Sequence, residues 1–196
     1  MNSLLIRAED KNIWEKRAAI VPDDLKLILE ETGAEAYIEK SEKRFFTGTS
    51  YEVAGAKPCE GMEKGDVIFG VKEIPEEKIL DDKTYIFFSH TIKGQSSGMP
   101  LLKKIMAANA TLIDYEKITD DKNRRLIYFG RYAGDAGAID ILHLMGEYWE
   151  HHGIDTPFKA CRAAHQYASV ADAKEHISKI GQTIKKQGLP EKLLPM

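Results

Sequence analysis

The sequence is poor in cysteine, in long apolar runs and in excess charge of either sign. Its 196 residues include two cysteines, Cys59 and Cys161, too few for a disulfide framework and too far apart for a cysteine metal site. No apolar run approaches the roughly 20 residues of a membrane-spanning helix. The start, Met1–Arg7, is too short for a signal peptide. We therefore expect reduced thiols, no membrane and a cytoplasmic location.

Charge and histidine content exclude further classes of function. The 28 basic and 31 acidic residues give a net charge of −3, which offers no general reason to expect nucleic acid as a partner. The six histidines form no HExxH run and no convincing metal pair. The hydrophobic fraction of 43% is enough for a real core, in one domain or one and part of a second. We expect no metal site.

Short apolar segments alternate with helix signals, and this alternation is typical of an α/β fold. The expected strands are Leu4–Arg7, Ala36–Ile38, Asp66–Val71, Thr84–Phe88, Thr111–Tyr115 and Leu126–Phe129. The expected helices run from Pro22 to Gly33, over Tyr51–Ala54, from Pro100, from Tyr132 to His152 and from Val170 to Gln187. Residues 41–65 are turn-rich. The short polar turn at Asp120–Asn123 predicts that the last two strands form an antiparallel hairpin.

Two ionisable side chains follow neighbouring apolar strands. Lys72 comes directly after Asp66–Val71, and His90 follows Thr84–Phe88. Open α/β sheets build their sites at the carboxyl ends of strands, so Lys72 and His90 are candidates for an acid/base pair. A surface ion pair between Lys72 and Glu73, and a structural histidine, are the plainer alternatives. The residues alone leave both open.

Arg17 lies in a charged run just before the first expected helix. A guanidinium there could bind a substrate carboxylate with two parallel hydrogen bonds. A solvated charge run is the interpretation that the local sequence favours.

Glycines 130, 134 and 137 follow an expected strand and open a helix, as a dinucleotide-binding fingerprint would. Three residues separate the first two glycines, however, where the fingerprint has one. No acidic strand end follows about 20 residues later, as the fingerprint would require. We expect these glycines to permit close helix packing and not to bind phosphate.

Five motifs occur in a fixed order that resembles a known family. They are Trp-Glu-Lys-Arg-Ala-Ala-Ile-Val-Pro (14–22), Gly-Val-Lys-Glu-Ile-Pro (70–75), Phe-Phe-Ser-His-Thr-Ile-Lys-Gly-Gln (87–95), Leu-Ile-Asp-Tyr-Glu (112–116) and Phe-Gly-Arg-Tyr-Ala-Gly (129–134). The set resembles the amino-terminal domain shared by alanine dehydrogenase, proton-translocating transhydrogenase and the lysine-forming saccharopine dehydrogenases. Within that family it is similar to the lysine–2-oxoglutarate reductase region of aminoadipic semialdehyde synthase.

The resemblance implies a mostly parallel, flavodoxin-like or Rossmann-like sheet flanked by helices, which binds substrate. It implies that Lys72 and His90 are the acid/base pair and that Arg17 binds a substrate carboxylate. Other positions are implied with supporting roles: Lys93 and Arg125 as further cleft charges, and Glu73 and Glu116 as acidic neighbours that tune the lysine and the histidine. The implied substrates are lysine, 2-oxoglutarate and saccharopine, with NAD(P) in the complete enzyme.

The same resemblance divides the chain into a substrate domain, residues 1–131, and long helices, residues 132–196, of a nucleotide-binding domain whose glycine-rich strand is missing. We therefore expect the chain alone to bind no cofactor and to be inactive, and to be completed by a separately encoded Rossmann chain or by the rest of a longer protein. We also expect a homo-oligomer. Two alternatives stay open: a standalone amino-acid or keto-acid binding or regulatory module, and an alanine-dehydrogenase-like substrate domain. The choice between NAD and NADP stays open as well.

Overall fold

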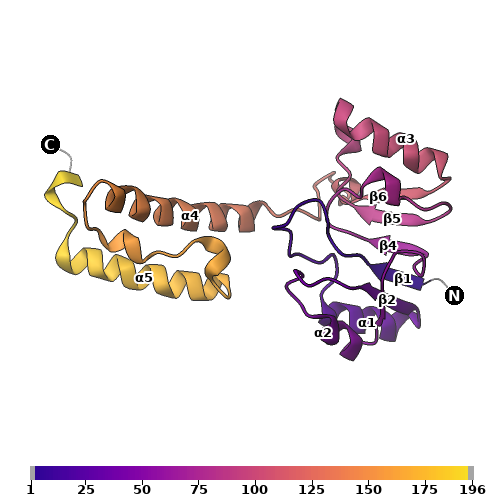
Figure 1. The fold of residues 1–196 in the computed structure, drawn as a ribbon, viewed down its shortest axis with the longest axis horizontal. Helices are drawn as coiled ribbons and strands as arrows, with labels where there is room; N and C mark the ends of the chain where they lie inside the picture. Colours follow the sequence, from indigo (N-terminus) through magenta and orange to yellow (C-terminus); the bar gives the residue numbers. More distant parts are fainter. Residues whose placement is uncertain (1–2, 194–196) are drawn as a thin grey trace. The chain divides into compact units, whose positions relative to one another are not determined.

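A computed structural model describes residues 3–193 and shows one six-stranded parallel sheet (Figure 1). The strands are β1 (Ser3–Ile6), β2 (Glu35–Glu39), β3 (Lys57–Cys59), β4 (Val67–Phe69), β5 (Thr84–Phe87) and β6 (Thr111–Asp114), in the order β3-β2-β1-β4-β5-β6. Every neighbouring pair is parallel. The predicted α/β class with a parallel sheet is confirmed.

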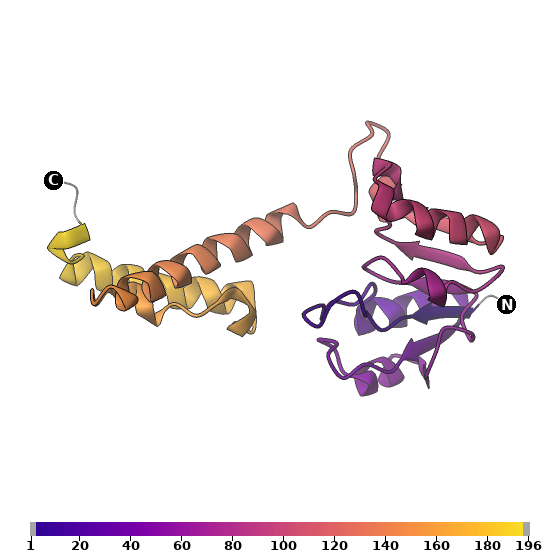
Figure 2. The same cartoon turned by 45° about the horizontal axis from the view of Figure 1, so that its top comes forward.

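Helices cover both faces of the sheet because successive strand residues point to opposite sides. Leu4 and Ile6 of β1 pack in one cluster with Leu25 of α1 (Pro22–Thr32) and with Tyr51 of α2 (Gly48–Val53). Leu5 belongs to a second cluster. That cluster contains Leu101 and Ile105 of helix α3 (Met99–Ala107), which Figure 2 shows on the opposite side of the sheet from α1. The core therefore has two layers, one on each face.

The ends of the predicted helices follow local chemistry. Pro22 begins α1, and Gly33 ends it with a φ of +62°, a left-handed conformation that glycine adopts without strain. Thr47 caps α2 by accepting a hydrogen bond from the Ser50 N–H. The second helix thus begins before the predicted Tyr51, because the threonine cap sets its start.

The predicted strand Leu126–Phe129 and its hairpin are wrong. An isolated antiparallel bridge joins Thr119 to Arg125, and no strand of the described residues follows it. Leu126 and Tyr128 are largely exposed, so no layer covers that segment. The sheet contains one strand that the sequence did not predict, β3, which lies inside the segment that we expected to be turn-rich. It is three residues long and contains Pro58, which a sheet tolerates at an edge such as the one β3 occupies.

The chain divides into two compact units between Ile127 and Tyr128, and the sheet belongs to the first. The second contains α4 (Gly130–His151) and α5 (Val170–Gln187). On α5 the predicted apolar stripe faces inward, with Ala173 and Ile180 buried. On α4 the one buried residue is Gly146, and Met145, expected on an apolar face, is exposed.

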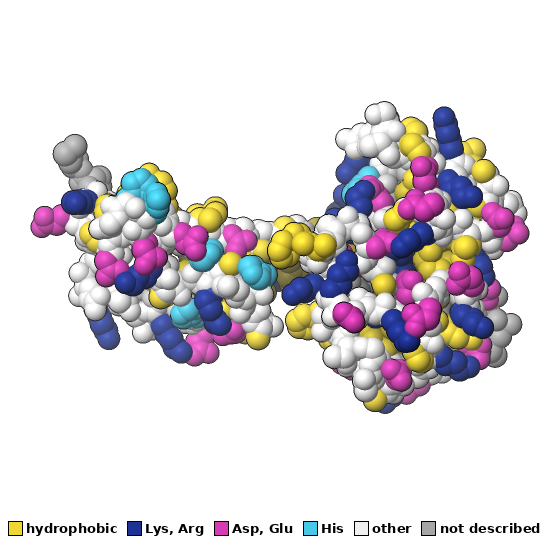
Figure 3. All heavy atoms as spheres, viewed as in Figure 1, with side chains coloured by type: hydrophobic (Ala, Val, Ile, Leu, Met, Phe, Trp, Pro, Cys, Tyr) yellow, Lys and Arg dark blue, Asp and Glu magenta, His cyan; other side chains and the backbone are white. Residues whose placement is uncertain are grey.

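The surface mixes charges of both signs. In the space-filling view, acidic and basic side chains lie next to one another over the sheet-containing unit (Figure 3). This agrees with the small net charge of −3. Among residues 3–193, none of the helices has the length and apolar character needed to cross a bilayer.

Candidate active site at the carboxyl edge of the sheet

The candidate residues leave the sheet at one edge. The order of strands reverses between β1 and β4, and in open α/β sheets ligands bind outside the carboxyl ends of the strands at such a point. Lys72 follows β4, and His90 follows β5. The pairing of these two strands continues beyond their ends, because the Phe88 N–H donates to the Val71 carbonyl at 3.2 Å. Lys72 and His90 therefore start from adjacent points of the edge.

Glu9, in the loop after β1, holds the start of the Lys72 loop. Its buried carboxylate accepts hydrogen bonds from the backbone N–H of Val71 at 2.7 Å and of Lys72 at 2.9 Å. Burial raises the pKa of Glu9, while these two N–H groups and the charge of Arg7 oppose that shift. Arg7 lies 3.6 Å from the same carboxylate. The backbone before Lys72 is thus fixed by the loop after β1, the strand that pairs with β4 in the sheet.

Glu15 and Arg17 form a two-pronged ion pair. The Nε and Nη2 of Arg17 donate to the two carboxylate oxygens of Glu15 at 2.7 and 2.6 Å. The hydrogen bond from Arg17 lowers the pKa of Glu15 and raises that of Arg17, and the charge of Lys72 also lowers the Glu15 pKa. Glu15 is buried whereas Arg17 is half-exposed. The buried carboxylate therefore orients a guanidinium that still faces solvent.

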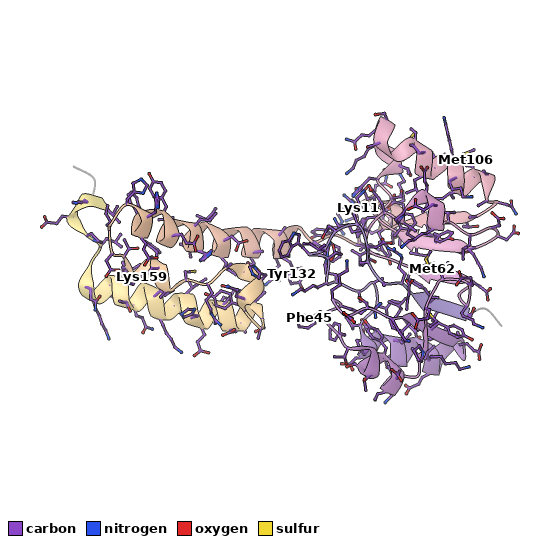
Figure 4. All side chains as sticks on the ribbon, in the orientation of Figure 1. Lys11, Phe45, Met62, Met106, Tyr132 and Lys159 are labelled. Carbon is purple, nitrogen blue, oxygen red and sulfur yellow. The ribbon has the colours of Figure 1, made fainter. Side chains whose placement is uncertain are left out.

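Glu73 does not lie where we expected it. Its carboxylate bonds the ammonium group of Lys11 at 2.6 Å, and Lys11 is among the side chains labelled on the sheet unit in Figure 4. The acidic side chain whose pKa responds to the charge of Lys72 is Glu15. A carboxylate from the loop after β1 therefore responds to the charge of Lys72.

Glu116 gathers three of the predicted residues. His90 Nδ1 lies 3.1 Å from Glu116 Oε2, and Arg125 donates to Oε1 at 2.7 Å. The ammonium of Lys93 is 3.8 Å from Oε1. Burial by itself would raise the pKa of Glu116, but the His90 hydrogen bond and the charges of His90, Lys93 and Arg125 together hold it below its usual value. The carboxylate is therefore ionised at neutral pH.

Two contacts of His90 Nδ1 require different tautomers of the imidazole. The Lys93 ammonium lies 3.1 Å from His90 Nδ1. An ammonium group only donates, so Nδ1 cannot serve Lys93 as an acceptor and donate to Glu116 at once. The ionised Glu116 favours a proton on Nδ1, and Lys93 then pairs with the carboxylate. With the proton on Nδ1, Nε2 is the ring nitrogen with a free lone pair.

A hollow of about 330 Å³ lies beside this edge. Lys11 and Glu73 line it together with residues around the start of α3: Ser97, Gly98, Pro100 and Leu101. The Lys11–Glu73 pair therefore lies on a concave surface. The sequence did not predict this position.

The residues described do not form a nucleotide loop. Gly130, Gly134 and Gly137 all lie within α4, so they make no turn between a strand and a helix. A Cβ atom on Gly134 or Gly137 would meet nothing within 4 Å, so the predicted close packing at these two glycines is also wrong. Within residues 3–193, no group of three or more histidine, cysteine, aspartate or glutamate side chains is placed to hold a metal ion.

Sequence reasoning missed Glu9, Glu15 and Asp114, which is buried at the end of β6. Each follows or ends a strand, or lies in a charged run, so its position was visible in the sequence. Their burial and their hydrogen-bond partners, which lie 2 to 63 residues away, were not visible in the sequence.

A parallel α/β sheet with charged side chains at its carboxyl edge is typical of a domain that binds a small molecule. The pattern of the family described as alanine dehydrogenase/PNT, N-terminal domain, matches residues 5–136, and the chain belongs to this family.

Similar proteins agree with this assignment. The chain is 38% identical to alpha-aminoadipic semialdehyde synthase of Arabidopsis thaliana and to the mitochondrial enzyme of Rattus norvegicus, over 97% and 98% of its length. These matches cover 18% and 21% of those proteins, so the chain spans about a fifth of their length. It is 39% identical to saccharopine dehydrogenase [NAD(+), L-lysine-forming] of Candida albicans, over 69% of the chain and 36% of that protein.

Solved structures share the fold. An L-alanine dehydrogenase superposes with a TM-score of 0.59 at 19% identity, covering 76% of this chain and 42% of its own. The transhydrogenase from Sinorhizobium meliloti superposes with a TM-score of 0.57 at 17% identity, covering 71% of this chain and 43% of its own.

Proposed function

We propose that this chain is the substrate-binding part of an oxidoreductase that forms or cleaves saccharopine. The single observation that carries the proposal is the charged edge of the sheet, where the Glu15–Arg17 pair, Lys72 and the His90–Glu116 pair lie on adjacent loops. The family and the relatives with saccharopine-related names support it.

The proposed chemistry begins with lysine and 2-oxoglutarate. Lys72 accepts a proton from the ε-ammonium group of lysine, and the resulting amine attacks the ketone carbon of 2-oxoglutarate to give a carbinolamine. His90 then donates a proton from Nε2 to the carbinolamine oxygen. The C–O bond breaks, water leaves, and the nitrogen lone pair forms the C=N bond of a protonated imine. The Glu116 carboxylate stabilises the protonated imidazole that this step requires.

Arg17 is proposed to bind a substrate carboxylate. Glu15 orients the guanidinium through two hydrogen bonds, and the arginine side chain is 44% exposed to solvent. Lys93 and Arg125, both near Glu116, add positive charge at the same edge. Positive groups around the site suit saccharopine, which carries three carboxylates.

NAD(P) does not fit the residues described, because the chain's glycine cluster is helical and forms no phosphate-binding loop. NAD(P) is implied for the complete enzyme by the relatives, one of which names NAD(+). We propose that this chain alone binds substrate without oxidising NADH or NADPH. We propose that the second compact unit, called unit 2 below, consists of helices of a nucleotide-binding domain. Another polypeptide segment or chain would complete that domain.

Calorimetry on the 196-residue chain tests the proposal directly. Saccharopine, lysine, 2-oxoglutarate and alanine are titrated separately into the wild type and into Arg17→Met. We expect saccharopine to bind and Arg17→Met to weaken it by about tenfold or more, since charged hydrogen bonds are lost. Binding of alanine alone would favour an alanine-dehydrogenase-like domain, and binding of none of the four would contradict the proposal.

A further inference from the structure

Asp114 ends β6 and is one of the few buried carboxylates in the described part of the chain. It carries no predicted catalytic role, and no cation pairs with it among the contacts of residues 3–193. The hydrogen bonds that its carboxylate accepts come from two loops, the one after β5 and the one after β6. These are the loops that carry His90 and Glu116.

The first loop is held through Ser89. Asp114 Oδ2 accepts from the Ser89 backbone N–H at 3.3 Å and from the Ser89 hydroxyl, a side chain with no exposed surface. Because the serine proton is used on Asp114, the Thr91 hydroxyl donates to Ser89 Oγ, 2.8 Å away. The Thr91 N–H points to the same oxygen at 3.2 Å. The residues on both sides of His90 are thereby fixed.

The second loop is held by the other oxygen. Asp114 Oδ1 accepts from the Glu116 backbone N–H at 2.8 Å and caps the short 3₁₀ helix Tyr115–Lys117. One carboxylate therefore joins the strand end that presents His90 to the strand end that presents Glu116.

His90 needs such support. Its backbone φ is +56°, in the left-handed region that a residue with a Cβ atom adopts only when its surroundings hold it there. This conformation directs the imidazole to Glu116, with Nδ1 at 3.1 Å from the carboxylate. The aromatic ring of Phe88 stacks near the imidazole at 6.4 Å between centroids.

We propose that Asp114 is the positioning residue of the His90–Glu116 pair: its carboxylate fixes the two loops so that the imidazole and the glutamate meet in one tautomer. The use of that pair in catalysis rests on the proposed function, but the positioning itself does not.

The test compares Asp114→Asn with a matched control, Asp120→Asn. Asp120 also accepts from the backbone N–H two residues later, Lys122 at 2.9 Å, but it lies further along the segment after β6 and none of its hydrogen bonds goes to Ser89 or Glu116. Asparagine keeps one acceptor oxygen and puts an amide NH2 group, which only donates, at the other position, so it cannot accept from both loops. Ser89→Ala, which removes only the hydroxyl link, serves as a second variant if Asp114→Asn does not fold.

Two measurements on the 196-residue chain decide the positioning. Imidazole ¹⁵N spectra report which nitrogen of His90 is protonated, and amide hydrogen exchange reports the protection of Ser89 and Glu116. We expect Asp114→Asn to average the tautomer signals and to speed exchange at both amides by about tenfold or more, as lost charged hydrogen bonds predict. Asp120→Asn is expected to leave all of these unchanged. Wild-type spectra and wild-type protection in Asp114→Asn would overturn the proposal.

Saccharopine binding separates this inference from the proposed function. We expect Asp114→Asn to weaken binding by about tenfold, and Asp120→Asn by no more than about twofold. If the wild type binds none of the three substrates, the proposed function fails, while the spectra and the exchange rates still decide the role of Asp114. If Asp114→Asn disturbs the histidine but binds saccharopine as the wild type does, the pair is positioned by Asp114 and is not part of the binding surface.

Discussion

The backbone N–H of Lys72 donates to the carboxylate of Glu9 at 2.9 Å, across 63 residues of sequence. Glu9 also accepts from Val71, and an added Cβ on Gly70 would lie 3.0 Å from Arg7 Cδ and 3.5 Å from Glu9 Oε1. The end of β4 is therefore built around a buried acid from the loop after β1. This contact joins the two strands at which the sheet order reverses, where the proposed site lies.

Glu9→Gln is expected to lower the free energy of unfolding by about 1–3 kcal/mol, because the amide can accept from only one of the two N–H groups and leaves the other unpaired in a buried place. The loss depends on pH. Burial raises the pKa of Glu9 in the folded protein, so the stability due to this group is present below the pKa of the unfolded chain and declines as pH rises through the folded value.

Urea unfolding between pH 4 and pH 8 checks this prediction. The difference in stability between wild type and Glu9→Gln should shrink as the pH rises from about 4, the usual range of a glutamate. Glu30→Gln, an exposed position on α1, is the control and should change little at any pH. A difference that grows with pH would show that the two N–H donors, and not burial, dominate the pKa of Glu9.

The fold was largely predictable because most strands and helices carry strong local signals. Pro22 and Gly33 delimit α1 by their own backbone preferences. The strand β3 was not predictable, since three residues with a proline show no alternation. The wrong strand at Leu126–Phe129 has the opposite cause: its residues are apolar, but in the structure they are mostly exposed, and no local pattern reports what covers a segment.

The sequence predicted which charged residues gather at one edge of the sheet, but not the contacts that they make. Glu116, His90, Lys93 and Arg125 do meet, because β5 and β6 are neighbours and parallel. The expected partnership of Glu73 with Lys72 does not appear in the contacts. Glu73 bonds Lys11, 62 residues earlier in the sequence, and no local pattern reports such a partner.

Glu116→Gln should remove stability that is present at neutral pH. The pKa of Glu116 is held low, so its contribution is present above the unfolded value and is lost as pH falls through the folded one. The wild type should therefore exceed the variant in thermal midpoint at pH 7, and the two should converge towards pH 3. Glu76→Gln, on an exposed 3₁₀ helix, is the control. A constant difference across this range would mean that the charge of Glu116 contributes nothing.

Lys72→Met should slow turnover strongly and leave the fold intact. If Lys72 is the base in imine formation, its removal from the complete enzyme should lower kcat by about 10²–10⁴-fold, the usual contribution of a positioned acid or base. Lys103→Met, at an exposed position on α3, should keep the wild-type rate. The measurement is oxidation of NADH or NADPH in the presence of lysine and 2-oxoglutarate. A Lys72→Met enzyme with wild-type kcat would remove Lys72 from the mechanism.

Two glycines of α4 should respond to alanine in opposite ways. A Cβ on Gly146 would lie 2.5 Å from the Phe158 carbonyl oxygen, a backbone atom that cannot step aside, so Gly146→Ala should destabilise unit 2 by about 1–3 kcal/mol. A Cβ on Gly134 would meet nothing within 4 Å. Gly134→Ala should therefore stabilise the same helix, by about 0.5–1 kcal/mol, through the better helix propensity of alanine. Urea unfolding followed by Trp149 fluorescence reports on this unit, since Trp149 lies on α4 whereas Trp14 lies in the other unit. Equal effects of the two substitutions would contradict the close contact between α4 and the Pro157–Ala160 turn that the structure shows.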